Sequence, residues 1–227
     1  MYTLYGGKYT RSGLVEQVLT ECEVEFEQCE IDTAKGEQRS AEFLKINPAG
    51  WVPALATAEG AVLYETPAIN LYLAEKHLPG ELVPIGDDPD RGPFLSALFY
   101  ITGMLEPALK RYWFPDRYAD GRKDAETIKR VAFRDVVDYL VVIDQRLLDK
   151  GPFHLGERYS LVDLMLAYWS ESFIAPDNID HLEGVARCHE LVYHRPKIRG
   201  LKYTQRDRIK EYHELWASGA GFKLSEA

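Results

Sequence analysis

The first 78 residues show apolar positions with two different periods. Short strand-forming runs lie at residues 2–5, 23–32, 52–57 and 61–64, and the second run alternates with glutamates. Apolar side chains at helical spacing occupy residues 11–22, 40–46 and 66–78. The expected order is therefore β-α-β-α-β-β-α. A strand pair following a βαβ unit predicts a mixed four-stranded sheet covered by helices, an α/β domain.

The pattern changes after a segment rich in proline, glycine and aspartate. Beyond it we find no strand pattern, and helices are expected at residues 93–114, 124–149, 160–173, 183–194 and 205–217. The sequence thus predicts an α/β domain at residues 1–79, a linker at 80–92 and an all-α domain at 93–227.

Charge and composition argue against several classes of protein. The chain has 227 residues and a formal net charge of -9 at pH 7, so a nucleic-acid partner is disfavoured. The opening residues carry no basic, apolar leader, and no stretch is long and apolar enough to span a membrane. Three cysteines are too few and odd for a disulfide framework, so we expect reduced thiols in a cytoplasmic protein without a metal site.

The most specific string runs from Asn47 to Leu55 and reads Asn-Pro-Ala-Gly-Trp-Val-Pro-Ala-Leu. It resembles the Asn-Pro-x-Gly-x-Val-Pro-Ala-Leu segment of the cytosolic, bacterial-type glutathione S-transferase family. In that family the bond equivalent to Val52-Pro53 is cis, and the valine backbone pairs with the cysteinyl part of glutathione as an added strand does. The resemblance implies a thioredoxin-like N-terminal domain in which Trp51, Val52 and Pro53 bind glutathione.

Two further positions fit the same ligand. Glu65-Thr66 begins a predicted helix, with Thr66 expected as its N-cap and Pro67 as its first residue. A helix N-terminus offers unpaired N–H groups to a carboxylate, and Glu65 could hold an ammonium group. Gln38, by its distance from the Asn-Pro turn, matches a family position that often donates a hydrogen bond to glutathione.

The thiol-activating group is expected in the loop from Gly6 to Ser12. A hydroxyl that donates to the glutathione thiolate lowers the pKa of the thiol. Tyr9 and Thr10 match the serines of serine-type transferases, and Ser12 is a third candidate. Tyr5 lies near the residue that the tyrosine type uses, but it can equally be a packing residue. The choice among these four hydroxyls stays open, and no cysteine occupies the loop.

The resemblance extends into the helical domain. The string Gly156 to Asp163 resembles a capping motif of the family, with Ser160 as the cap and Asp163 returning the hydrogen bond. Family members bind the acceptor substrate between the two domains, along the first helix of the second. The matching candidates are Met104, Arg111 and Tyr112, with Arg111 available to an anionic acceptor. Homodimers are usual in the family.

The function implied is conjugation of glutathione, as co-substrate, to an electrophilic, apolar or aromatic small molecule, with a role in detoxification. Two alternatives belong to other classes. One is a binding or regulatory protein that keeps the fold without catalysis. The other is a glutathione-dependent thiol oxidoreductase, which is disfavoured because no reactive cysteine lies at the first helix.

Overall fold

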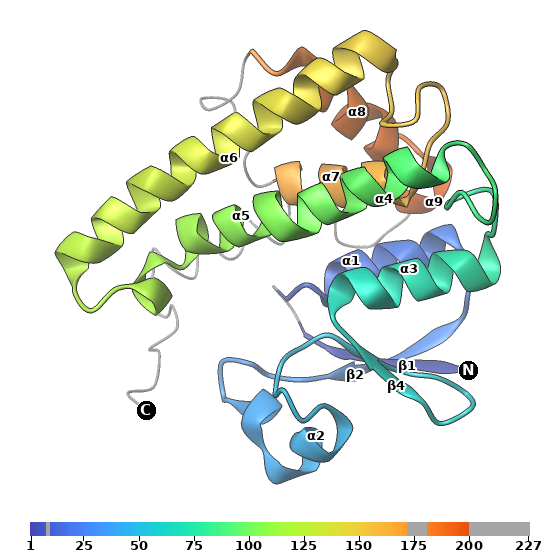
Figure 1. The fold of residues 1–227 in the computed structure, drawn as a ribbon. Helices are drawn as coiled ribbons and strands as arrows, with labels where there is room; N and C mark the ends of the chain where they lie inside the picture. The colour runs from blue at the N-terminus through green and yellow to red at the C-terminus, as the bar shows by residue number, and fades with distance from the viewer. Residues whose placement is uncertain (8–9, 172–180, 200–227) are drawn as a thin grey trace. The chain divides into compact units, whose positions relative to one another are not determined.

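A computed structural model describes residues 1–7, 10–171 and 181–199 (Figure 1). These residues form two compact units. The first contains residues Met1–Leu78 together with helix α9 (Pro196–Arg199), and the second is Pro79–Arg195. The helix expected at 205–217 lies outside the described residues.

The first unit is built on a mixed four-stranded sheet, as predicted. Its strands are β1 (Tyr2–Gly6), β2 (Phe26–Glu30), β3 (Ala54–Ala56) and β4 (Val62–Tyr64). Their order across the sheet is β2-β1-β3-β4. Strand β1 runs parallel to β2 and antiparallel to β3, and β4 runs antiparallel to β3.

Helices cover both faces of this sheet. They are α1 (Ser12–Glu21), the short 3₁₀ turn η1 (Glu37–Arg39), α2 (Ala41–Ile46) and α3 (Thr66–His77). Helices α1 and α3 lie side by side on one face and α2 lies on the other (Figure 1). The apolar stripe predicted for the first helix is fully buried: Leu14, Val15, Val18 and Leu19. The predicted helical face is therefore the one that packs on the sheet.

The second predicted strand begins later than expected, because the chain first has to end α1. Glu23 adopts a left-handed conformation with φ 55°. The N–H of Val24 then donates to the carbonyl of Leu19 at 3.0 Å, and that of Glu23 to Thr20 at 3.0 Å. This pair of bonds is a Schellman motif, which satisfies the last carbonyls of the helix. Glu23 and Val24 therefore belong to this helix end, and strand β2 begins at Phe26.

The second unit is helical. Its long elements are α4 (Arg91–Tyr100), α5 (Glu106–Trp113), α6 (Arg122–Lys150), α7 (Leu161–Glu171) and α8 (Glu183–Tyr193), with a 3₁₀ turn η3 (Pro115–Tyr118). The residues described contain only isolated β-bridges here and no strand. Helix positions expected from the sequence are confirmed wherever the chain is described. None of the helices described is both long and apolar enough to cross a bilayer.

The predicted helix at 93–114 is interrupted by a π turn, η2 (Ile101–Leu105). The N–H of Glu106 donates to the carbonyl of Ile101, five residues back. Pro107 explains the widening, because a proline cannot donate to the carbonyl four residues earlier, that of Gly103, and its ring clashes with it. The wider turn relieves this clash while keeping the two helical segments continuous.

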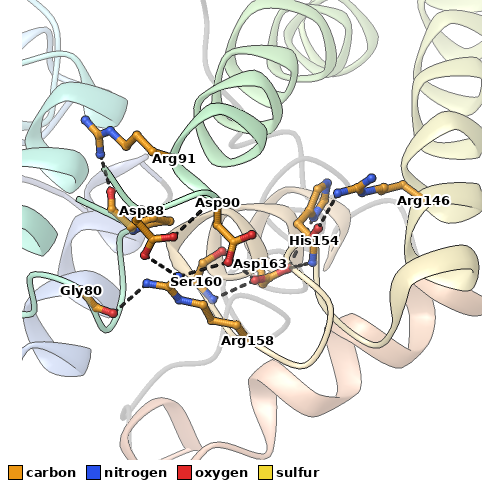
Figure 2. A network of polar contacts seen from close by, with 10 residues as sticks. Gly80, Asp88, Asp90, Arg91, Arg146, His154, Arg158, Ser160 and Asp163 are labelled. Atoms are coloured by element: carbon orange, nitrogen blue, oxygen red, sulfur yellow. Dashed lines mark hydrogen bonds and ion pairs between the residues drawn. The ribbon is translucent and has the colours of Figure 1, made fainter. Parts of the chain in front are cut away.

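A buried carboxylate organises the loop before α7 (Figure 2). Asp163 accepts hydrogen bonds from the N–H of Ser160 at 2.8 Å, from the hydroxyl of Ser160 at 2.8 Å and from the N–H of His154 at 2.7 Å. The returning bond from Asp163 to the N–H of Ser160 is the one predicted for the capping motif. Asp163 therefore ties the start of α7 to the turn that precedes it.

Arg158, in the loop before α7, contacts the first residues of the second unit (Figure 2). Its guanidinium pairs with Asp88 at 2.8 Å and with Asp90 at 3.2 Å, and it donates to the carbonyl of Gly80 at 2.8 Å. The pKa of the Asp88 carboxyl is lowered, first of all by the hydrogen bond from Arg158. The proline-rich segment expected as a linker thus makes specific contacts with the loop before α7.

Candidate functional site

The strand register brings the four candidate segments to one end of the sheet. Gly6 lies opposite Glu30, so the loops after β1 and β2 leave at the same end. Tyr5 lies opposite Ala54, and Ala54 opposite Tyr64. The turn before β3 and the entry into α3 are therefore at that end as well. The parallel and antiparallel strand pairs therefore bring together segments that are distant in the chain.

The loop after β1 contains a compact set of hydroxyl contacts. The Thr10 hydroxyl donates to the carbonyl of Gly7 at 2.7 Å and lies 2.8 Å from the hydroxyl of Ser12. The N–H groups of Gly7 and Ser12 each donate to Thr10 Oγ1 at 3.3 Å. Thr10 is half-buried, whereas Ser12 is only 4% exposed. The loop therefore presents the Thr10 side chain and encloses that of Ser12.

Two glycines make this loop possible. A Cβ at Gly6 would lie 2.3 Å from Cβ of Ser12 and 2.5 Å from its hydroxyl oxygen. A Cβ at Gly7 would lie 2.4 Å from the carbonyl oxygen of Ile31. Both distances are far below normal contact, so only glycine allows the loop to lie this close to β1 and to the end of β2.

Of the other two hydroxyl candidates of the sequence, the structure describes only Tyr5. Tyr9 lies outside the described residues. The ring of Tyr5 packs edge-on against Phe43 with centroids 6.3 Å apart, beside a buried cluster that includes Val52 and Ala54. Tyr5 is thus part of the core under α2.

The Asn-Pro turn presents the backbone of Val52. The Val52-Pro53 bond is cis, as the resemblance implied. The side chain of Asn47, 1% exposed, donates to the carbonyl of Trp51 at 2.7 Å and accepts from the N–H of Ala49 at 3.1 Å. Within the described part of the chain, the N–H and carbonyl of Val52 have no backbone partner. An extended peptide could use both groups.

A positively charged side chain, that of Arg39, contacts this turn. The Arg39 guanidinium stacks over the Trp51 ring at 4.7 Å from its centroid, and it donates to the carbonyl of Ala49 at 3.1 Å. Trp51 is 49% exposed. The neighbouring Gln38 has a buried side-chain oxygen without a hydrogen-bond partner among the described residues. Cation–π stacking keeps such an arginine extended and available to an anion.

The start of α3 differs from the sequence prediction by one position. Thr66 is the first helical residue rather than the N-cap, and Pro67 is the second; Glu65 occupies the cap position. Thr66 is 1% exposed, and no group in the described ranges pairs with its hydroxyl. The hydroxyl therefore does not cap the helix.

Glu65 itself is exposed and has φ 68° and ψ 110°, outside the regions that side-chain-bearing residues normally adopt. Such a conformation costs about 1–3 kcal/mol and concentrates at ligand clamps. A helix N-terminus with an unsatisfied hydroxyl, flanked by an exposed carboxylate, can hold both charged groups of an amino acid.

The predicted acceptor residues lie in the second unit and differ in their contacts. Arg111 forms an ion pair with Asp135 of α6 at 3.2 Å. The Tyr112 ring lies against Phe133, with centroids 5.8 Å apart, and under the ammonium of Lys129. Met104, on the π turn, is 42% exposed. Two of the three thus take part in α5–α6 packing, and Met104 has the largest exposed fraction.

None of the three cysteines belongs to the loop after β1, although Cys29 lies on β2 opposite Tyr5. All are free thiols. Burial raises the pKa of the Cys22 thiol to about 12, and burial also raises the pKa of the Cys188 thiol well above its usual value. Neither of these two forms the thiolate that nucleophilic chemistry requires at neutral pH.

Two residues at this end of the sheet were not among the sequence candidates. In the sequence Asn47 is only the first residue of the string that runs to Leu55, yet its side chain shapes the turn that presents Val52. The family position points to Gln38 and not to its neighbour Arg39. A signal for Arg39 exists in the chain, because an arginine pairs readily with an exposed tryptophan, but only the folded turn brings the two together.

Comparison with known proteins agrees with this geometry. The N-terminal domain model of the glutathione S-transferases matches residues 1–75. Glutathione S-transferase hmp2 of Hypomyces subiculosus is 38% identical over 172 residues, covering 71% of this chain and 77% of that protein. Disulfide-bond oxidoreductase YfcG of Escherichia coli is 28% identical over 204 residues, covering 86% and 92% respectively.

A solved structure is similar over nearly the whole chain. The glutathione transferase homologue from Sulfitobacter, crystallised with bound glutathione, has a TM-score of 0.77 and 25% identity, covering 89% of this chain and 97% of that one. Together with the Hypomyces relative, this similarity identifies the fold as a thioredoxin-like domain followed by an all-helical one. The chain belongs to the glutathione S-transferase family.

Proposed function

We propose that this chain binds glutathione at the carboxyl end of β1 and β2 and conjugates it, through its thiolate, to an electrophilic, apolar or aromatic small molecule. The observation that carries the proposal is the buried Thr66 hydroxyl at the N-terminus of α3, which has no partner in the described ranges. It lies at the end of the sheet where Val52 presents its backbone and the β1 loop offers a hydroxyl. The glutathione bound to the Sulfitobacter homologue supports the same ligand here.

Each part of glutathione has a matching group. The γ-glutamyl carboxylate would accept from the N–H groups of the first turn of α3 and from Thr66, and its ammonium would pair with Glu65. The cysteinyl backbone would pair with Val52, next to Pro53. The glycyl carboxylate would be held by Gln38 and by Arg39, which stacks on Trp51. This assignment satisfies every charged group of the tripeptide.

We assign thiol activation to Thr10. Its side chain is half-buried, and two N–H groups donate to its oxygen, which makes the hydroxyl a better donor. Its O–H would stabilise the thiolate after the thiol proton leaves to solvent. The thiolate then attacks the electrophilic carbon, forming the carbon–sulfur bond as the leaving group departs with the electron pair. Ser12 is too enclosed for this direct contact, and Tyr9 and Tyr5 are the competing candidates.

The acceptor site is proposed along α4, η2 and α5, with Met104 as its main contact. Arg111 and Tyr112 would contribute mainly through their α5–α6 contacts, unless an anionic acceptor competes for Arg111. The free cysteines are consistent with a reducing cytoplasm, where conjugation would serve detoxification. A homodimer is also proposed, since side chains such as Phe99 are 67% exposed.

The proposal is tested by titration calorimetry with glutathione and by conjugation of chlorodinitrobenzene followed spectrophotometrically. Saturable binding and enzyme-dependent conjugation are expected, and Thr10→Ala should lower the conjugation rate far more than Thr10→Ser. A protein that binds no glutathione would overturn the proposal. Binding without any turnover would instead favour the non-catalytic alternative. Light scattering after size exclusion tests the dimer, and a monomer at working concentration would refute that part.

A second function, disulfide reduction by glutathione, is favoured by the similarity to the Escherichia coli oxidoreductase. A glutathione thiolate held by Thr10 could attack a small disulfide and expel one thiolate. A second glutathione would then release the other half and leave oxidised glutathione. This route needs no cysteine of the protein. Reduction of hydroxyethyl disulfide, coupled to glutathione reductase, separates it from conjugation, because only the disulfide reaction consumes two glutathiones for each oxidised product.

A further inference from the structure

The hydroxyl of Ser12 lies behind that of Thr10 and makes a contact that the proposed function does not use. Ser12 Oγ is 2.8 Å from Thr10 Oγ1 and 3.3 Å from the carbonyl oxygen of Gly7. Its side chain is 4% exposed and fills the space that Gly6 leaves by lacking a Cβ. An enclosed serine that contacts the hydroxyl at the reactive position can act through that hydroxyl.

We propose that Ser12 is a positioning residue that holds the Thr10 hydroxyl as a hydrogen-bond donor toward the glutathione sulfur. The inference rests on the proposed function and deepens its activation step. Ser12 itself does not touch the substrate. Its hydroxyl donates to Thr10 Oγ1, so that the hydrogen of Thr10 is directed away from Ser12 and is free to turn toward a bound sulfur.

The distances favour this direction of the hydrogen bond. Either oxygen could by itself donate in the 2.8 Å contact, but the shorter bond from Thr10 to the Gly7 carbonyl, at 2.7 Å, uses the single hydrogen on Thr10 Oγ1 and leaves the hydrogen of Ser12 for that contact. The alternative acceptor for Ser12, the Gly7 carbonyl at 3.3 Å, is more distant. Ser12 O–H, Thr10 O–H and the Gly7 carbonyl therefore form a chain in which each bond strengthens the next.

Binding of glutathione would redirect only the last bond of the chain. The Thr10 hydrogen turns about the Cβ–Oγ bond from Gly7 to the thiolate, and no proton changes owner. The Gly7 carbonyl keeps the N–H of Thr10 at 3.2 Å and is within reach of the Ser12 hydroxyl at 3.3 Å. Ser12 thus keeps its single hydrogen on Thr10 Oγ1, and the N–H of Thr10 remains as the donor to the Gly7 carbonyl.

The test measures the thiol pKa of bound glutathione from its ultraviolet thiolate absorbance as a function of pH. Four proteins are compared: the wild type, Ser12→Ala, Thr10→Ala and the double variant. In Ser12→Ala this pKa should rise by on the order of half to one unit, a threefold to tenfold loss of thiolate at pH values below the wild-type pKa of the bound thiol. In the Thr10→Ala background the same change should have no further effect, because Ser12 acts only through Thr10.

Control measurements separate this role from a structural one. Ser12→Thr keeps the hydroxyl and should keep the wild-type pKa, and Ser12→Gly removes the hydroxyl in its place if the alanine variant does not fold. Glutathione affinity at low pH, where the thiol is protonated in every variant, should be unchanged. An unchanged pKa in Ser12→Ala, or an equal rise in both backgrounds, overturns the role of Ser12 alone. Absence of glutathione binding in the wild type overturns the proposed function as well.

Discussion

Replacement of Thr66 by valine should change folding stability and ligand affinity in opposite directions. Valine keeps the branched shape of threonine and has a similar helix propensity, so the variant removes the hydroxyl and little else. Thr66 is 1% exposed, and its hydroxyl has no partner in the described structure. In the free protein this hydroxyl is therefore a buried polar group without a hydrogen bond.

The magnitudes follow from the two states of this one oxygen. A buried polar group without a partner costs about 1–3 kcal/mol, so Thr66→Val should raise the free energy of unfolding by about 1–2 kcal/mol in the absence of glutathione. In the complex the hydroxyl would donate to a carboxylate, a bond that contributes about 1.5–3 kcal/mol. Glutathione affinity should therefore fall roughly 10- to 100-fold.

Urea denaturation without ligand and titration calorimetry with glutathione measure the two effects. An unchanged m-value is required, so that a higher midpoint reports stability rather than a change in the unfolded chain. Thr66→Ser is the matched control, since it keeps the hydroxyl and loses only a methyl group. It should keep most of the affinity and lose stability, the reverse of the valine variant. Lower stability together with unchanged affinity in Thr66→Val would refute the reasoning, because the hydroxyl would then have a structural partner.

Three further predictions concern the rest of the chain. Gly184→Ala should lower the melting temperature, since its Cβ would lie 2.8 Å from a backbone oxygen of α6 and would force α6 and α8 apart; calorimetry measures this. Arg158→Ala should lower the melting temperature more near pH 7 than in strong acid. The lowered pKa of Asp88 stabilises the folded state at pH values above the pKa of this carboxyl in the unfolded chain, and this contribution is lost as pH falls through the lowered pKa. Melting curves of the two proteins should therefore differ less in acid, where the hydrogen bond from Arg158 to the Gly80 carbonyl remains. A maleimide applied to the folded protein should label Cys29 before Cys22, because burial raises the pKa of Cys22 to about 12; peptide mass spectrometry detects the order.

Local sequence signals were enough to predict most elements of the fold. The alternation of apolar residues and the turn-forming Asn47-Pro48 string act within a few residues of one another, so their meaning does not depend on distant contacts. The same is true of the capping motif ending in Asp163, where the predicted bond to Ser160 is present. The motif around Val52-Pro53 likewise indicates glutathione binding from its residue identities alone.

Other features required the tertiary structure. The sequence predicts that Arg111 could bind an anionic substrate. In the structure, helix α6 places the carboxylate of Asp135 3.2 Å from its guanidinium. The π turn before Pro107 follows from a local clash, yet the helical pattern on either side is continuous and conceals it. Arg39 becomes a candidate for binding an anion only because the folded turn places the Trp51 ring beneath its guanidinium. In each case the deciding contact is one that no periodicity reveals.

The hydroxyls of the loop after β1 show most clearly which features the sequence determines and which require the tertiary structure. The sequence by itself determined that a hydroxyl, and not a cysteine, stands where the sulfur is expected, because residue identity is enough to exclude covalent thiol chemistry there. It could not rank Thr10 against Ser12, since the two are equivalent in chemistry and two residues apart. Only the close approach of β1, permitted by Gly6, encloses Ser12 and leaves Thr10 accessible. Burial is a property of the packed molecule, and it is the difference on which the proposed roles of the two hydroxyls rest.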